Sequence, residues 1–212
     1  MVSSVFLPAF QQSWISKAHQ ISGEIHHTFY YPETGTVGPT GTKSHWNLFS
    51  GTPATCVNIA LHHFLQEDPV DLVISGPNFG RNSSSMFIAS SGTVGAAQEA
   101  SFCGKRAIAV SFAFLRDEGY GDQEVERACR IALEVIKKLV EGWPAGVQLF
   151  NINVPVFMNM PKELEVYQTF IFQNTSASLF KEKVLEDFID LLFIYHSCSP
   201  NACPVSSLDL SL

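Results

Sequence analysis

The sequence has 212 residues, of which 46% are hydrophobic and 16% are charged. This is enough apolar material for one folded domain with a buried core, and it excludes a disordered regulator. Thirteen Lys and Arg against 20 Asp and Glu give a formal net charge of −7, and the basic residues are scattered. Because a long nucleic acid needs a cationic surface, we expect no such partner. No apolar run approaches the ~20 residues of a membrane-spanning helix, so we expect no membrane association.

The cysteine content favours a reducing compartment. There are five cysteines, an odd number, and Cys56, Cys103 and Cys129 fall in patterns typical of a buried helix or its edge. Cys198 and Cys203 fall in a segment where only His196 could be a further zinc ligand, so a solvated tail is the better interpretation. The first ten residues lack the basic stretch of a secretory signal. We therefore expect a cytoplasmic protein with reduced thiols.

The first third of the chain predicts short strands separated by loops. The predicted strands are Val2 to Leu7, Glu24 to Tyr31 and His45 to Ser50. The Gly, Thr and Pro content of Thr34 to Lys43 predicts an exposed loop. Thr52 is a good N-cap and Pro53 a good first residue for a helix that follows.

The middle of the chain alternates strands with helices. Val70 to Ser75 is a nearly continuous apolar run, typical of a strand buried on both faces, and a polar, Gly-rich loop follows from Gly76 to Ser90. The next predicted elements are a helix from Gly92 to Cys103, a strand from Arg106 to Phe112, a helix from Asp122 to Glu141 and a strand from Val147 to Val154. This alternation predicts an α/β fold with a mostly parallel sheet. In such sheets, ligands bind beyond the carboxyl ends of the strands.

After Pro155 the pattern weakens. We expect a strand within Glu163 to Gln173, a helix within Phe180 to Ile194 and a loose tail from Ser197 to Leu212.

The clearest functional pattern is the sequence SGPNFGRN at 75–82 followed by SSGTVGAA at 90–97. A helix that begins at Ser91, Gly92 and Thr93 offers free backbone N–H groups and partial positive charge, which suit a phosphate. Asn78, at the end of its strand, has an amide oxygen that can face a hard cation or a substrate oxygen. A purely structural interpretation also fits, in which the glycines form turns, Ser91 caps the helix and Asn78 stabilises the loop.

These two segments resemble the signature of the SurE (survival protein E) nucleotidases and acid phosphatases. GTPATCV from Gly51, CGKRAIAVS from Cys103 and NINVP from Asn151 agree with the same family. QQSWISKAH and GPNFGRN are most similar to its fungal branch, in which the domain is often fused to a tubulin–tyrosine-ligase-like domain. The resemblance predicts a SurE-like domain over residues 1–181 and an atypical C-terminal tail over 182–212.

The resemblance implies a divalent-metal-dependent phosphomonoesterase, either a 5'/3'-nucleotidase or an acid phosphatase. The implied fold is a Rossmann-like three-layer α/β sandwich with a mostly parallel sheet. The implied substrate is a phosphomonoester such as a nucleoside monophosphate. By resemblance, Ser13 and Asn78 are ligands of Mg²⁺ or Mn²⁺, the phosphate-binding residues are Ser91, Gly92 and Thr93, and Thr52 lies nearby. Family members commonly form dimers or larger assemblies through their C-terminal region.

One feature of the family is absent. The family begins with a strand ending in Asn-Asp-Asp-Gly, whose aspartates belong to the metal site. This sequence contains no Asp-Asp pair, and its first acidic residue is Glu24. Because hard divalent cations need carboxylate oxygens, Ser13 and Asn78 alone predict weak metal binding and low turnover. No catalytic residue is assigned, and Glu24 and Glu33 are the candidates for a replacement carboxylate.

The resemblance also implies that the first strand and helix of the family fold are missing. Two strands would then lack a hydrogen-bonding partner, or Val2 to Leu7 would pair with Val70 to Ser75. Unpaired parallel edges invite association. The alternatives to an active enzyme are a non-catalytic phosphate- or nucleotide-binding remnant and a fragment of a larger SurE-containing protein.

Overall fold

The computed structural model describes residues 3–39, 44–114, 119–158, 166–169 and 171, together with the backbone of 180–185 and 188–193. The chain forms two compact units. One comprises Met1–Ser83 and Phe87–Leu164, and the other comprises Ser84–Met86 and Glu165–Leu212. All the candidate site residues lie in the first unit.

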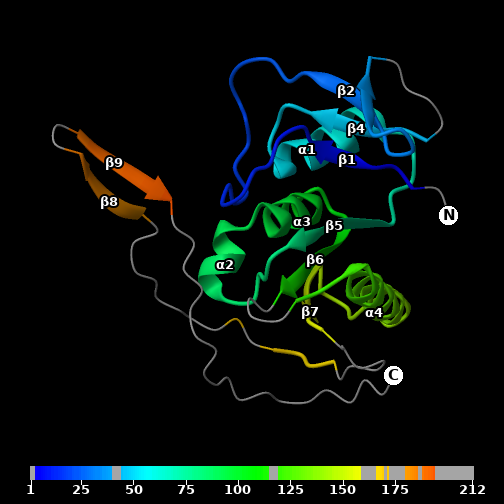
Figure 1. The fold of residues 1–212 in the computed structure, drawn as a ribbon. Helices are drawn as coiled ribbons and strands as arrows, with labels where there is room; N and C mark the ends of the chain where they lie inside the picture. The colour runs from blue at the N-terminus through cyan, green and yellow to red at the C-terminus, as the bar shows by residue number, and fades with distance from the viewer. Residues whose placement is uncertain are drawn as a thin grey trace. The chain divides into compact units, whose positions relative to one another are not determined.

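The first unit contains a four-stranded sheet. Its order is β1 (Phe6–Pro8), β4 (Trp46–Phe49), β2 (His27–Tyr31) and β3 (Thr36–Gly38) (Figure 1). β1 is parallel to β4, whereas β2 is antiparallel to both β4 and β3. The predicted loop from Thr34 to Lys43 is therefore wrong in part. Gly35, with a φ of +68°, allows a tight turn in which its N–H donates to Tyr31 O at 2.8 Å, and the chain then returns as β3.

The helix predicted after Thr52 is confirmed. Helix α1 spans Pro53–Ile59 and continues as one π-helical segment, η1 (Ala60–Phe64). The Thr52 side chain accepts a hydrogen bond from the Thr55 backbone N–H at 3.1 Å, and Pro53 occupies the first turn. The local cap chemistry therefore decides where this helix begins.

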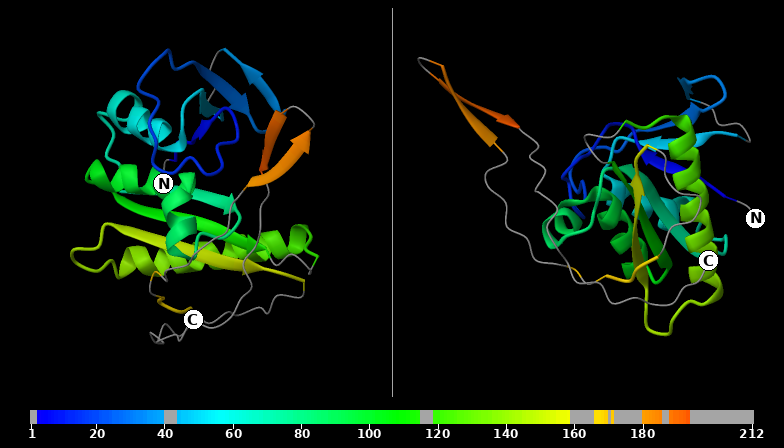
Figure 2. Two further views of the ribbon diagram at one scale, coloured as in Figure 1. Left: turned by 90° about the vertical axis from the view of Figure 1, so that its left-hand side faces the viewer. Right: turned by 60° about the horizontal axis from the view of Figure 1, so that its bottom comes forward.

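A second, fully parallel sheet lies in the same unit. Its order is β5 (Leu72–Phe79), β6 (Arg106–Phe114) and β7 (Leu149–Val156). Helix α3 (Gly92–Phe102) and helix α4 (Asp122–Glu141) cover opposite faces of this sheet, and the short helix α2 (Ser85–Ser90) precedes α3 (Figures 1 and 2). The predicted α/β alternation is thus confirmed.

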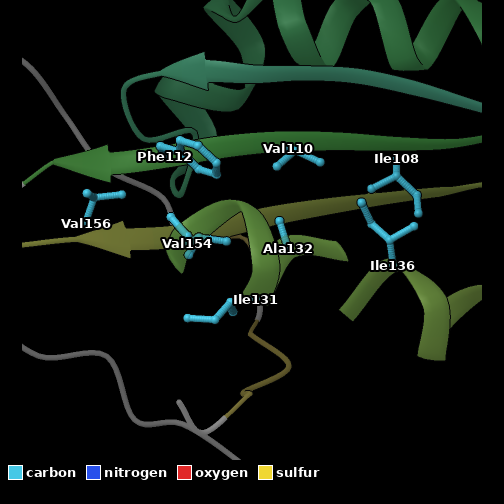
Figure 3. Close-up of a cluster of buried hydrophobic side chains, with 9 residues drawn as sticks. Ile108, Val110, Phe112, Ile131, Ala132, Ile136, Val154 and Val156 are labelled. Carbon is cyan, nitrogen blue, oxygen red and sulfur yellow. The ribbon is translucent and has the colours of Figure 1, made fainter. Parts of the chain in front are cut away.

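The two faces of the parallel sheet differ in side-chain size. Toward α4, bulky side chains of β6 and β7 meet the apolar stripe of the helix (Figure 3). This cluster contains Ile108, Val110, Phe112, Ala128, Ile131, Ala132, Ile136, Val154 and Val156. Toward α3 the buried residues are small, with Ala97 and Ala100 against Ala107 and Ala109. Small side chains on both elements bring α3 close to the sheet.

Strand β5 is not buried on both faces, contrary to prediction. Ile74 is 47% exposed and Phe79 is 73% exposed. The physical reason is that α4 packs on β6 and β7, and β5 is an end strand of its sheet. β1 is likewise an end strand. Among the described residues, neither β1 nor β5 is paired on its other side, and the two strands do not pair with each other.

In the second unit, the predicted helix within Phe180 to Ile194 is wrong. The backbone forms two antiparallel strands, β8 (Phe180–Leu185) and β9 (Phe188–Phe193). Phe180, Phe188 and Phe193 lie in these two segments, and phenylalanine favours strands over helices. The strand predicted within Glu163 to Gln173 lies largely outside the described residues, and the predicted tail lies wholly outside them.

The cysteines in the described residues are as predicted. Cys56, Cys103 and Cys129 are free thiols, whereas Cys198 and Cys203 lie outside the described residues. Burial raises the pKa of the Cys56 thiol to about 12, so this thiol is unreactive at neutral pH. In the part of the chain that the structure describes, no helix is both long enough and apolar enough to cross a bilayer.

Candidate functional site

The candidate site is built around the first turn of α3, which follows the carboxyl end of β5. Ser91 is the N-cap, and its Oγ accepts from the Val94 backbone N–H at 3.2 Å. Ser91 and Gly92 are buried, and Thr93 is half-buried. The first turn contains no acidic residue, so the partial positive charge of the helix N-terminus is not neutralised by its own side chains. Ser91 therefore has the capping role that the structural interpretation allowed, at a helix end whose electrostatics favour an anion.

An irregular loop, residues 9–20, lies against this helix start. The Ser16 backbone N–H donates to Ser90 O at 2.9 Å, and Ser16 Oγ donates to Ala89 O at 2.5 Å. A Cβ atom built on Gly92 would lie 3.0 Å from Ile15 Cγ2 and 3.4 Å from Gln12 O. The close approach at Gly92 is thus made by the chain itself, through Gln12 and Ile15, which precede and follow Ser13 and Trp14 in the loop.

Thr52 contacts loop 9–20 rather than the first turn of α3. Its hydroxyl donates to Ala18 O at 2.5 Å, and the Gln20 backbone N–H donates to Thr55 Oγ1 at 3.2 Å. Thr52 therefore holds the far end of loop 9–20 against α1 while its own Oγ1 caps that helix.

Replacing Gly95 with Ala is expected to displace loop 9–20. A Cβ at this position would lie 2.5 Å from Ser16 O and 2.8 Å from Lys17 Cα, both backbone atoms that cannot rotate away. We expect the Gly95→Ala variant to lose about 1–3 kcal/mol of unfolding free energy, measured by urea denaturation. Ser101→Ala on the same helix is the control and should change stability by less than about 0.5 kcal/mol. Equal stability of Gly95→Ala and the wild type would contradict this packing.

Asn78 lies near the carboxyl end of β5, and Asn82 lies on the segment that connects β5 to α2. The Asn78 side-chain N–H donates to Gly80 O at 2.8 Å, so its Oδ1 is the atom that can accept a hydrogen bond or face a cation. Asn82 is 5% exposed. With its amide oriented so that donors face acceptors, Asn82 accepts from Ser91 Oγ at 2.9 Å and from Ser111 Oγ at 2.8 Å.

The Asn82 backbone is hydrogen-bonded to side chains of β7. Its N–H donates to Asn153 Oδ1 at 2.7 Å, and its carbonyl accepts from Asn151 Nδ2 at 2.7 Å. Asn82 therefore joins β7, β6 and the N-cap of α3, a role that sequence reasoning missed. The available signal was Ser111, Asn151 and Asn153, polar residues in otherwise apolar strands.

The residues of this site do not fit a divalent cation. Ser13 is exposed, and its Oγ accepts from the Gln11 side chain. Ser13 and Asn78 offer a neutral hydroxyl and a neutral amide, whereas Mg²⁺ and Mn²⁺ prefer carboxylate oxygens. Within the described residues, no group of three or more His, Cys, Asp or Glu comes together to hold a metal. The hydroxyl of Ser13 and the amide of Asn78 therefore make a poor donor set for Mg²⁺ or Mn²⁺.

A parallel sheet with helices on both faces, and a helix start at the carboxyl edge of its strands, defines a Rossmann-like α/β domain. A family model described as Survival protein SurE matches residues 2–177. Because this match covers most of the described fold, the chain belongs to the SurE family.

Individual relatives agree with this assignment. A probable tubulin–tyrosine ligase of Saccharomyces cerevisiae, PBY1, is 33% identical over 84% of this chain and 27% of its own length. The 5'-nucleotidases SurE of Rhodopirellula baltica and Ruegeria pomeroyi are 38% and 34% identical over 52% and 70% of this chain. These matches cover 42% and 54% of the two nucleotidases, so the chain spans about half of their length. The yeast relative fits the expected fungal branch.

A solved structure supports the fold. The SurE protein from Aquifex aeolicus matches with a TM-score of 0.56 and 21% sequence identity, over 89% of this chain and 70% of that chain. The Rossmann-like α/β architecture predicted from the sequence is therefore confirmed.

Proposed function

We propose that this chain binds phosphomonoesters, such as nucleoside monophosphates, at the start of α3, and that its own hydrolytic activity is low. The observation that supports the proposal best is the first turn of α3. It lies at the carboxyl edge of a parallel sheet, has no acidic side chain and is flanked by hydroxyl groups. Relatives named 5'-nucleotidase support the phosphomonoester class of ligand.

In this proposal the chain supplies hydrogen-bond donors to the phosphate oxygens. The backbone N–H groups of Gly92 and Thr93 belong to the first helical turn, where no intrahelical acceptor exists for them. The hydroxyl group of Thr93 adds one further donor, whereas the Ser91 hydroxyl already donates to Asn82 Oδ1. Asn82 keeps the Ser91 side chain in place through its contact with Oγ.

The low activity follows from the donor set. Ser13 and Asn78 are the proposed ligands of Mg²⁺ or Mn²⁺ by family resemblance, and two neutral oxygens would hold such an ion weakly. Phosphate monoester hydrolysis is among the slowest uncatalysed reactions, and without a well-held cation the developing charge is poorly stabilised. A non-catalytic phosphate-binding module is the second candidate, favoured by the same observation.

Three further expectations accompany the proposal. The SurE-like domain extends over residues 1–181, with the atypical tail over 182–212. The protein acts in the cytoplasm, and it associates into dimers. The open edges of β1 and β5 are consistent with association.

Binding and hydrolysis of AMP test the proposal directly. We expect calorimetric titration to detect AMP binding and no binding of adenosine, because the site recognises the phosphate. With added Mn²⁺ or Mg²⁺, we expect release of inorganic phosphate at close to the rate of the protein-free buffer. Brisk metal-dependent turnover that chelator abolishes would overturn the proposed low activity. Equal affinity for AMP and adenosine would overturn the phosphate site.

A further inference from the structure

Loop 9–20 has a backbone that external contacts must hold in place. Trp14 and Ser16 have φ values of 61° and 57°, in the left-handed region that favours glycine. Such conformations are energetically unfavourable for residues other than glycine and persist only where surrounding contacts impose them. The loop contains no helix or strand, so its conformation depends on what it packs against.

One face of α3 receives the loop. Gly92, Gly95 and Glu99 are spaced at i, i+3 and i+7, so they lie on the same side of the helix. The two glycines allow the loop backbone to approach, since Cβ atoms there would meet Gln12 and Ser16 at 3.4 and 2.5 Å. Glu99 ends this stripe two turns from the candidate phosphate site.

Glu99 is a buried carboxylate that contacts the C-terminal part of loop 9–20 and helix α1. It is 6% exposed. Its Oε2 lies 2.5 Å from Lys17 Nζ and 3.1 Å from His19 Nε2, and both of these residues belong to loop 9–20. Its Oε1 accepts from Asn58 Nδ2 of α1 at 2.8 Å. Lys17 Nζ also lies 5.1 Å from the centre of the Phe102 ring, so one ammonium group is held by two residues of α3.

Burial alone would raise the pKa of Glu99. Hydrogen bonds from Lys17, Asn58 and His19 outweigh burial and lower the pKa to about 2. The carboxylate is therefore ionised at neutral pH, and the Lys17 ammonium is its closest compensating charge.

We propose that Glu99 is a positioning residue of the phosphate site: its ion pair with Lys17 holds loop 9–20, and with it Ser13, against the first turn of α3. This role rests on the proposed phosphate-binding function. In this role the Lys17–Glu99 ion pair acts on the geometry of the phosphate site and not on the core of the parallel sheet. The reason is that α3 packs on the sheet through a different face, which is rich in alanine.

The test compares a variant that lacks the Lys17–Glu99 ion pair with proteins that keep it. The double variant Lys17→Met/Glu99→Gln removes both charges, so no unpaired ion remains buried. Lys17→Arg keeps the charge pair. Arg130→Met/Glu126→Gln is the control, since it removes an exposed ion pair on α4 whose atoms lie 2.6 Å apart. The loop is observed by ¹⁹F NMR of protein labelled with 5-fluorotryptophan, in which Trp14 reports on the loop and Trp46 and Trp143 report on the rest of the fold. AMP affinity is measured in parallel by calorimetry.

We expect the double variant to keep the Trp46 and Trp143 signals and to shift or broaden the Trp14 signal. If the loop is then docked about one tenth of the time, AMP affinity falls about tenfold. Lys17→Arg and the α4 control should match the wild type in both measurements. An unchanged Trp14 signal, or a displaced loop with unchanged AMP affinity, would overturn the positioning role. Absence of AMP binding by the wild type would instead overturn the proposed function, and the Trp14 signal alone would then show whether the ion pair holds the loop.

Discussion

Replacing Thr93 with Asp is expected to abolish phosphate binding while leaving the protein folded. Thr93 is the second residue of α3, where a negative side chain is favourable for the helix itself. The same carboxylate would lie beside the bound phosphate. Two unit charges about 4 Å apart near a protein surface repel by about 4 kcal/mol, so we expect AMP affinity to fall by about a hundredfold or more. Calorimetric titration and a thermal melt measure the two effects.

The matched control for this change is Gln123→Asp. Gln123 is exposed and is the second residue of α4. The Gln123→Asp change therefore adds the same charge at the same helical position, but away from the site. AMP affinity of this variant should equal that of the wild type. Thr93→Asp with undiminished AMP binding would show that the phosphate binds elsewhere. The thermal melt shows whether Thr93→Asp still folds. If it does not fold, Thr93→Val, which replaces the hydroxyl with a methyl group, tests the same site.

Removing Lys17 alone is expected to cause the largest loss of stability. In Lys17→Met, the Glu99 carboxylate stays buried without its compensating ammonium group. Breaking a buried ion pair from one side costs about 3–5 kcal/mol, which urea denaturation measures. Arg130→Met is the control, because it breaks an exposed pair worth less than about 1 kcal/mol. A loss in Lys17→Met no larger than in the control would mean that the pair is unimportant.

The pH dependence of stability follows from the same pair. The folded pKa of Glu99 is about 2, below its ordinary value of 4.5, so the unfolded chain binds the proton more readily. The stabilisation by Glu99 is therefore complete above about pH 4.5 and is lost as the pH falls toward 2. The Glu99→Gln variant should be less stable than the wild type at neutral pH, and the difference should shrink across this acidic range. A difference that is independent of pH would contradict an ionised Glu99.

Local chemistry explains why much of the fold was predictable. Thr52 and Ser91 cap the helices that follow them, and the bounds of α4 agree with the predicted helix. These features depend on residues within one or two turns of each other. β8 and β9 were mispredicted as a helix because short segments such as these do not distinguish the helical from the strand periodicity by themselves.

The candidate site was predictable only as a set of segments. Motif resemblance selected Ser13, Asn78 and Ser91 to Thr93, and those assignments remain predictions. The packing of loop 9–20 showed that Gly92 is needed for the close approach of Gln12 and Ile15. The exposure of β5 also required the structure, since an apolar strand buried on both faces and one at the end of a sheet have the same sequence pattern.

The amino-acid sequence alone determined the α/β alternation, the helix starts, the family and the absence of an Asp-Asp pair. The tertiary structure alone decided that Asn82 contacts Ser91, and that Glu99 pairs with Lys17, 82 positions before it in the chain. The physical reason is that caps and turns depend on neighbouring residues, whereas a buried charge finds its partner only when packing brings distant segments together.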